Sequence, residues 1–316
     1  MKKIIIIILF LAVCQMGFSQ NPRWKYIDDT PIPARADLDV RWETSTKVFP
    51  PKMWIYELAP RKFSPKVISN LMFMCSFTEK DKVQQDTNGV AFNSSDGLRT
   101  LAISFLSGSI HYDMPEPHFS PTNLAEGVPK MSEMPDLTKN FLQKVGIQHS
   151  EITRDTNGAP HFSFWEPFTE YYLKGGGSIT NIEFRAVVFR RSVNGAEILG
   201  NPGYCELRFG EHGKISKIDF TWPDLKRYQS APTLKPDAII RLLHEGKARQ
   251  GATLDSVGYI DWMSVKSVTI KQAWPCYFAG DSNFLYPFLA LWTTVDTGHR
   301  IVEVGIDCPI IDETKL

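Results

Sequence analysis

Apolar residues recur at helical spacing in three segments of the chain. The first begins at Ser64, a favourable N-cap, with Pro65 at the first helical position, where its missing N–H costs nothing. The second spans 135–147 and contains Gly146, a suitable C′ residue. The third spans 233–248. Each segment places its apolar side chains on one face, so we predict three helices packed on a core.

Alternating apolar and polar residues predict antiparallel strands between and after these helices. The stretch "LRTLAISFLSGSIHYDMP" (98–115) predicts two strands joined at Ser107-Gly108. Asn194-Gly195 predicts a type I′ hairpin, because both central residues of that turn need positive φ. Three further strands are expected near the C-terminus, at 265–277, 284–296 and 300–311.

The order of these segments, a helix followed by strands, repeats along the chain. Such a repeat predicts an α+β fold of tandem helix-on-antiparallel-sheet units rather than a parallel βαβ sheet. The expected parts are an extended leader at 20–52, an N-terminal unit at 53–130, a central unit at 131–230 and a C-terminal unit at 231–316.

Residues 1–19 have the composition of a secretory signal peptide. Lys2-Lys3 precede the apolar run Ile4–Val13, which is shorter than the about 20 residues that span a bilayer, and cleavage is expected after Ser19. A competing interpretation makes "LAVC" a lipobox that carries a lipid on Cys14, although the preceding Val13 is bulky for that motif. No later segment is apolar enough to span a membrane. We therefore expect an exported protein, periplasmic or extracellular, without a transmembrane anchor.

The charge balance excludes some partners. The chain has 35 basic and 35 acidic residues, and removal of the signal peptide leaves 33 against 35, a net charge of −2. A nucleic-acid binder would show a basic face, and a protein attracted to anionic lipids would need a similar excess of positive charge. We expect neither partner.

Four cysteines remain after the signal peptide: Cys75, Cys205, Cys276 and Cys308. An even number in an exported protein permits two disulfides. Cys276 and Cys308 are the preferred pair, because both lie in the C-terminal strand region. The alternative is four buried, reduced cysteines, since cysteine packs well as a small apolar residue.

The stretch "VFRRSVNGAEILGNPGYCELRFGEHGKISKIDFTWPDL" (188–225) resembles the strand portion of PepSY-type domains, which have a hairpin, a strand, a "dGkI" turn and a return strand. The later helix and strands, with Tyr277 and then Pro287–Leu291, are similar to extracytoplasmic Yyc-type regulators of two-component systems. The resemblance covers about 135–310, with a weaker echo at 53–116. It implies PepSY/cystatin-like units in a non-enzymatic, regulatory protein that binds or restrains another extracytoplasmic protein.

The expected binding surface lies on the strand at 204–209 and on the turn after it. Cys205, Leu207 and Phe209 alternate with polar residues, which predicts a sheet with one covered face. The residues expected to contact a partner are Tyr204, Glu206, Arg208, Glu211 and His212.

A second hypothesis is a secreted carbohydrate-binding protein or glycoside hydrolase. The stretch "FWEPFTEYY" offers Trp165, Glu166 and Glu170, and carboxylates beside aromatic rings suit sugars. The competing interpretation is that these aromatic side chains belong to the core. None of the seven histidines lies in HExxH or HxH spacing, and no GxSxG motif occurs. We therefore predict no catalytic residue, no metal site and no cofactor.

Overall fold

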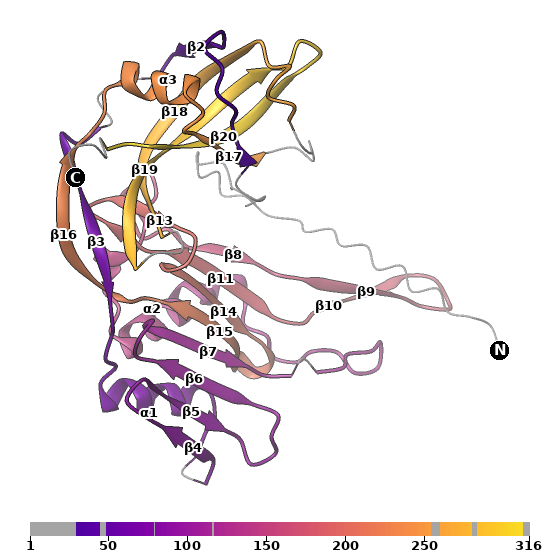
Figure 1. Ribbon diagram of the computed structural model, residues 1–316. Coiled ribbons are helices and arrows are strands. Elements are labelled where there is room, and N and C mark those ends of the chain that lie inside the picture. The colour runs from indigo at the N-terminus through magenta and orange to yellow at the C-terminus, as the bar shows by residue number, and fades with distance from the viewer. Residues whose placement is uncertain are drawn as a thin grey trace. The chain divides into compact units, whose positions relative to one another are not determined.

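The computed structural model describes residues 30–44, 49–78, 80–115, 117–253, 260–279 and 283–311 (Figure 1). The expected signal peptide, with Cys14, lies outside these ranges. The chain divides into two compact units. The first contains Pro60–Ser192 and Pro202–Asp224, and the second contains the described residues up to Ala59, Val193–Asn201 and those from Leu225 onward.

An eight-stranded sheet forms the frame of the first unit, with strand order β4-β5-β6-β7-β15-β14-β11-β8. The strands are β4 (Lys82–Gln85), β5 (Gly89–Asn93), β6 (Thr100–Ser104), β7 (Ser109–Asp113), β8 (Ser163–Trp165), β11 (Arg185–Arg190), β14 (Tyr204–Phe209) and β15 (Ile215–Thr221). All neighbours in this sheet are antiparallel. A separate hairpin of β9 (Phe168–Tyr172) and β10 (Ser178–Ile182) extends away from the sheet (Figure 1).

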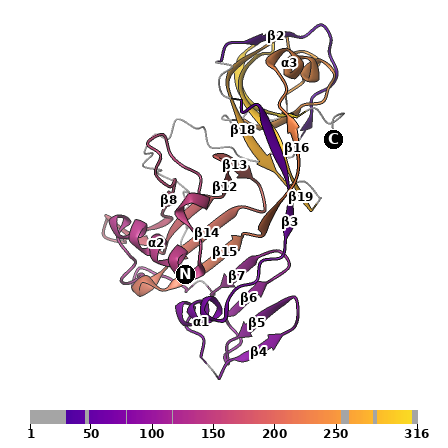
Figure 2. The same ribbon diagram turned by 90° about the vertical axis from the view of Figure 1, so that its left-hand side faces the viewer.

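One face of this sheet carries the core of the first unit. The helices α1 (Pro65–Met74) and α2 (Met134–Val145) both lie against it (Figure 2). Leu71 of α1 and Phe141 of α2 share one apolar cluster with Leu207 of β14 and Phe220 of β15. The inward residues of the strands therefore face the helices, and the opposite face of the sheet is left to polar side chains.

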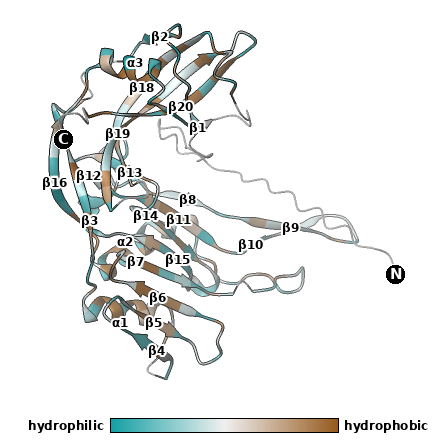
Figure 3. Cartoon of the chain, viewed as in Figure 1, coloured by the Kyte–Doolittle hydropathy of each residue, from teal (hydrophilic) through white to brown (hydrophobic). Residues whose placement is uncertain are grey.

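The second unit is built on a ten-stranded sheet whose longest strands are consecutive in the chain. Its strands are β1 (Thr30–Pro31), β2 (Asp39–Trp42), β3 (Lys52–Ala59), β12 (Ser192–Val193), β13 (Ala196–Leu199), β16 (Asp224–Pro232), β17 (Arg249–Thr253), β18 (Ser267–Phe278), β19 (Phe284–Asp296) and β20 (Ile301–Pro309). The helix α3 (Pro236–His244) packs Ile239 and Leu243 into its core. Strand β16 is hydrophilic along most of its length (Figure 3), in keeping with its exposure.

The expected leader contributes to this second core. Ile32 and Leu38 are buried there, and β2 pairs in parallel with β18. Trp42 packs edge-on against Phe49, with ring centroids 5.9 Å apart. The described part of the leader is therefore integrated into the second unit.

Several local predictions are confirmed. The Ser64 hydroxyl accepts a hydrogen bond from the Val67 N–H at 3.3 Å, and Gly146 ends α2 with φ 74°. Asn194 and Gly195 have φ values of 51° and 80°, as a type I′ turn requires. The third helix is shorter than expected and begins after Lys235.

None of the described helices has the length and apolar character needed to cross a membrane.

The expected fold class, α+β with tandem helix-on-sheet units, is wrong. The described chain is mostly β, with twenty strands and three α-helices in large sheets. Strand β7, expected in the N-terminal unit, pairs with β15, expected in the central unit, so His111 lies opposite Asp219. Apolar alternation identifies which face of a strand is buried but not its neighbour, and this long-range pairing merges the two expected units.

The expected Cys276–Cys308 disulfide is not formed. Cys276 lies opposite Phe288 and Cys308 opposite Leu289, so strand β19 separates the two cysteines. Two strand spacings amount to about 9–10 Å, beyond the roughly 7 Å between Cα atoms that a disulfide can bridge.

Cys75, Cys205, Cys276 and Cys308 are all buried free thiols. Burial raises the pKa of each, that of Cys308 to about 12. Because the thiolate is the reactive form, these residues act as small apolar core groups.

Candidate functional site

The expected binding residues on β14 lie on the polar face of the first unit's sheet. Cys205 and Leu207 point into the core, and Tyr204, Glu206 and Arg208 alternate with them on the other side. This face is more closely packed than the sequence suggests, because Glu206 is only 8% exposed.

Glu206 is the centre of a polar network. Its carboxylate accepts hydrogen bonds from the Tyr204 hydroxyl at 3.1 Å and from Arg208 Nε at 2.7 Å. Lys217 Nζ lies 3.9 Å from the same carboxylate. Desolvation, followed by the charge of Glu206, raises the pKa of Tyr204 well above its ordinary value. Tyr204 therefore stays a neutral hydrogen-bond donor and, with Arg208, stabilises a buried carboxylate.

Arg208 connects this network to a group of aromatic rings. Its guanidinium carbon lies 4.6 Å from the ring centroid of Phe184 and 5.6 Å from that of Trp165. The two rings meet edge-on at 5.4 Å. Stacking of a guanidinium on aromatic faces is favourable and holds the side chain in one orientation.

Beside this group the first unit has a cavity of about 230 Å³. It lies where β7 ends, next to the residues that precede β11 and the turn between β14 and β15. Three of the five expected binding residues, Arg208, Glu211 and His212, line it. The remaining lining residues could not be identified from the sequence, because the pairing of β7 with β15 brings them together from distant parts of the chain.

The turn at the rim of this cavity, Glu211–Gly213, is held in place by the segment around residue 126. His212 N–H donates to the Glu126 carbonyl at 3.1 Å, and Glu126 N–H donates to Glu211 Oε1 at 3.1 Å. His212 adopts φ 55°, an uncommon conformation for a residue other than glycine. A side chain at Gly127 would approach His212 Nδ1 to 2.8 Å. These reciprocal contacts fix the shape of the rim.

The lining of the cavity combines apolar and charged residues. Met114, Phe119 and Phe184, with two prolines at 115 and 117, are the apolar residues. The charged residues are three cations and three carboxylates, namely Arg208, Lys214, Lys217, Asp113, Glu183 and Glu211.

Two of the carboxylates accept hydrogen bonds within the protein, and the third has a lysine as its cross-strand neighbour. Glu183 accepts the Thr169 hydroxyl at 2.7 Å, Glu211 accepts a backbone N–H, and Asp113 lies directly opposite Lys217 in the ladder. Lys214, in contrast, is exposed and makes no ion pair with any residue in the described ranges. The cavity therefore offers an uncommitted positive charge at its rim.

The residues of the carbohydrate hypothesis do not form a pair of catalytic carboxylates. Glu166 Oε2 lies 2.6 Å from Arg185 Nε, in an ion pair. Glu170, on the projecting hairpin, accepts hydrogen bonds from the Ser178 and Tyr172 hydroxyls, and these lower its pKa. A general acid in a glycosidase needs a raised pKa, so Glu170 is poorly suited to that role.

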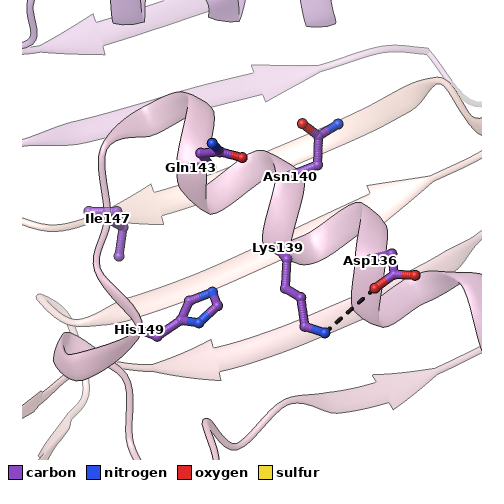
Figure 4. Close-up of a pocket in the computed structure, with 6 residues that line it drawn as sticks. All are labelled: Asp136, Lys139, Asn140, Gln143, Ile147 and His149. Carbon is purple, nitrogen blue, oxygen red and sulfur yellow. Dashed lines mark ion pairs between the residues drawn. The ribbon is translucent and has the colours of Figure 1, made fainter.

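A second hollow lies on the outer side of α2 (Figure 4). Asp136, Lys139, Asn140, Gln143, Ile147 and His149 line it, and Lys139 Nζ lies 3.5 Å from Asp136 Oδ1. The stick view shows that one helix and the turn after it provide all of these groups. The hollow lacks the apolar wall of the first cavity, so it is the weaker candidate for a ligand site.

Metal binding has no support in the described part of the chain, where no three His, Cys, Asp or Glu residues cluster as a metal site would require. His111 instead pairs with Asp219, with Nδ1 and Oδ1 3.2 Å apart. Both side chains are substantially exposed.

Comparison with known proteins does not assign the chain to a family. No family model matches the chain, and no curated protein matches it. Among solved structures, an uncharacterized protein from Eubacterium rectale ATCC 33656 is similar with a TM-score of 0.47 and 9% identity, over 88% of this chain and 90% of that chain. A likeness at this level assigns neither a fold family nor an activity. The PepSY-type and Yyc-type resemblance therefore stays a prediction.

Proposed function

We propose that this is an exported, non-enzymatic binding protein whose first unit holds another extracytoplasmic protein at the cavity beside Arg208. The observation that carries the proposal is the convergence of Arg208, Glu211 and His212, expected to bind from sequence alone, with apolar side chains on one small cavity. Apolar walls with a few fixed polar groups are typical of recognition sites.

The rigidity of the site also supports recognition. Arg208 is fixed between Glu206 and two aromatic rings, and the turn at 211–213 is tied to the segment at 126–127. A preorganised surface loses little conformational entropy when a partner binds. The strained conformation of His212 is also of the kind that concentrates at ligand-contacting sites.

The proposal is tested by capture of partners from an envelope fraction. Lys214→Glu places a negative charge at the rim without removing a group on which the fold depends, so we expect recovery of the bound partner to fall about tenfold. Lys139→Glu, on the outer side of α2, is the matched control and should leave recovery unchanged. Equal recovery by both variants and the unaltered protein would remove the cavity from consideration.

A further inference from the structure

We propose that the cavity binds the C-terminal residue of the partner chain, taking one large apolar side chain and its free α-carboxylate together. This inference rests on the proposed function and specifies the chemistry of the same site. It is drawn from the size of the cavity, from its mixed apolar and charged lining and from the uncommitted charge of Lys214.

The size of the cavity limits the ligand. Its volume of about 230 Å³ lies below the roughly 300–1,000 Å³ of sites for drug-sized ligands. It is therefore suited to a single residue or a group of similar size, and a cofactor or an oligosaccharide would exceed it.

The lining residues would complement a ligand residue that has both an apolar side chain and a charged group. Met114, Phe119 and Phe184 form an apolar surface for an aromatic or long aliphatic side chain. Lys214, which is exposed, also lines the cavity. Burial of an apolar side chain supplies affinity, and a charge-assisted hydrogen bond to a lysine fixes the orientation of the ligand.

The balance of charge favours an anionic group over a cationic one. An incoming cation would compete with the groups that already hold the carboxylates, namely the Thr169 hydroxyl on Glu183 and the Glu126 N–H on Glu211. An incoming anion meets Lys214, which is exposed and has no ion pair within the described ranges. A carboxylate is therefore the better-matched group.

A C-terminal residue meets both demands within one residue length. In an extended internal segment, neighbouring side chains point to opposite faces, so an apolar side chain and an adjacent Asp or Glu would not enter one small cavity together. At a chain end, the apolar side chain and the α-carboxylate belong to the same residue. Capture of a terminal carboxylate is an established way to recognise peptides.

The test uses N-acetyl-phenylalanine as the probe, with N-acetyl-phenylalanine amide as the matched uncharged compound. Chemical-shift perturbation of the exported chain should show saturable binding of the acid at residues around 114, 184 and 214. We expect the amide to bind about tenfold more weakly, the size of one charge-assisted contact. Lys214→Ala should weaken binding of the acid by a similar factor and leave binding of the amide unchanged.

Lys139→Ala is the matched control for the lysine substitution and should bind the acid as the unaltered protein does. Acid and amide of equal affinity, or no shift at the cavity, would overturn the C-terminal inference. If capture of a partner still depended on Lys214 in that case, the proposed function would stand and only the ligand chemistry would fail. If neither capture of a partner nor binding of the acid depended on Lys214, both the C-terminal inference and the proposed function would be refuted.

Discussion

Replacement of Glu151 by alanine should lower the free energy of unfolding of the first unit by about 3 kcal/mol. Glu151 Oε2 accepts hydrogen bonds from Arg191 Nη2 at 3.1 Å and from Trp222 Nε1 at 3.0 Å. The Arg191 side chain is only 9% exposed, and burial lowers its pKa to about 10. Without Glu151, the indole N–H of Trp222 loses its acceptor, and the buried Arg191 cation loses its carboxylate partner and keeps only the Pro223 carbonyl as an acceptor. Removal of one partner from a buried ion pair is strongly destabilising.

Two further substitutions identify the cause of that loss. Glu151→Gln keeps an oxygen that can accept the indole N–H of Trp222 but removes the charge. Its free energy of unfolding should therefore lie between those of the unaltered protein and Glu151→Ala. Asp136→Ala, at an exposed ion pair on α2, should cost less than about 1 kcal/mol. Hydrogen exchange of β14 and β15 amides during a urea titration would measure all three. Equal effects of Glu151→Ala and Asp136→Ala would contradict a stabilising role for the buried pair.

Gly108→Ala should destabilise the first unit by about 2–4 kcal/mol. Gly108 joins β6 to β7 with φ 62°, and its carbonyl oxygen accepts a hydrogen bond from the backbone N–H of Trp222 at 3.0 Å. A Cβ at this position would lie 2.7 Å from the Trp222 carbonyl oxygen and 2.8 Å from Pro223 backbone atoms. Because these contacts are with backbone, the conflict cannot be relieved by a side-chain rotation.

Gly97 provides a matched control for the glycine substitution. It has a similar φ of 71°, but a Cβ there would meet no atom within 4 Å. Gly97→Ala should therefore show only the conformational penalty, about 1 kcal/mol, and the difference between the two variants measures the steric conflict. Thermal unfolding of both variants under the same conditions makes the comparison. A Gly97→Ala variant as unstable as Gly108→Ala would refute the close-approach explanation.

Individual helix ends and turns could be predicted from the sequence, but the pairing of distant strands could not. Ser64, Gly146 and Asn194-Gly195 act through the backbone geometry of their own turn, so their roles can be identified from a few neighbouring residues. The pairing of β7 with β15 joins residues about 110 positions apart, and no local pattern specifies it. The fold class was wrong for that reason, since it assumed that each helix packs only on the strands next to it in sequence.

The site was predictable in part for a similar reason. Alternation along 204–209 placed Tyr204, Glu206 and Arg208 on one face correctly, because strand period alone determines it. Alternation could not show that Glu206 binds the other two, nor that Phe184 and Met114 complete a cavity beside them. Those relations depend on which strands and loops are neighbours.

The most direct test of the central claim is photo-crosslinking of the protein in the cells that produce it. A photoreactive residue at position 214 should give a covalent adduct with a second protein, and the same residue at position 139 should give none above background. An adduct of equal yield at both positions, or at 139 alone, would contradict the claim that the first unit recognises its partner at the cavity beside Arg208.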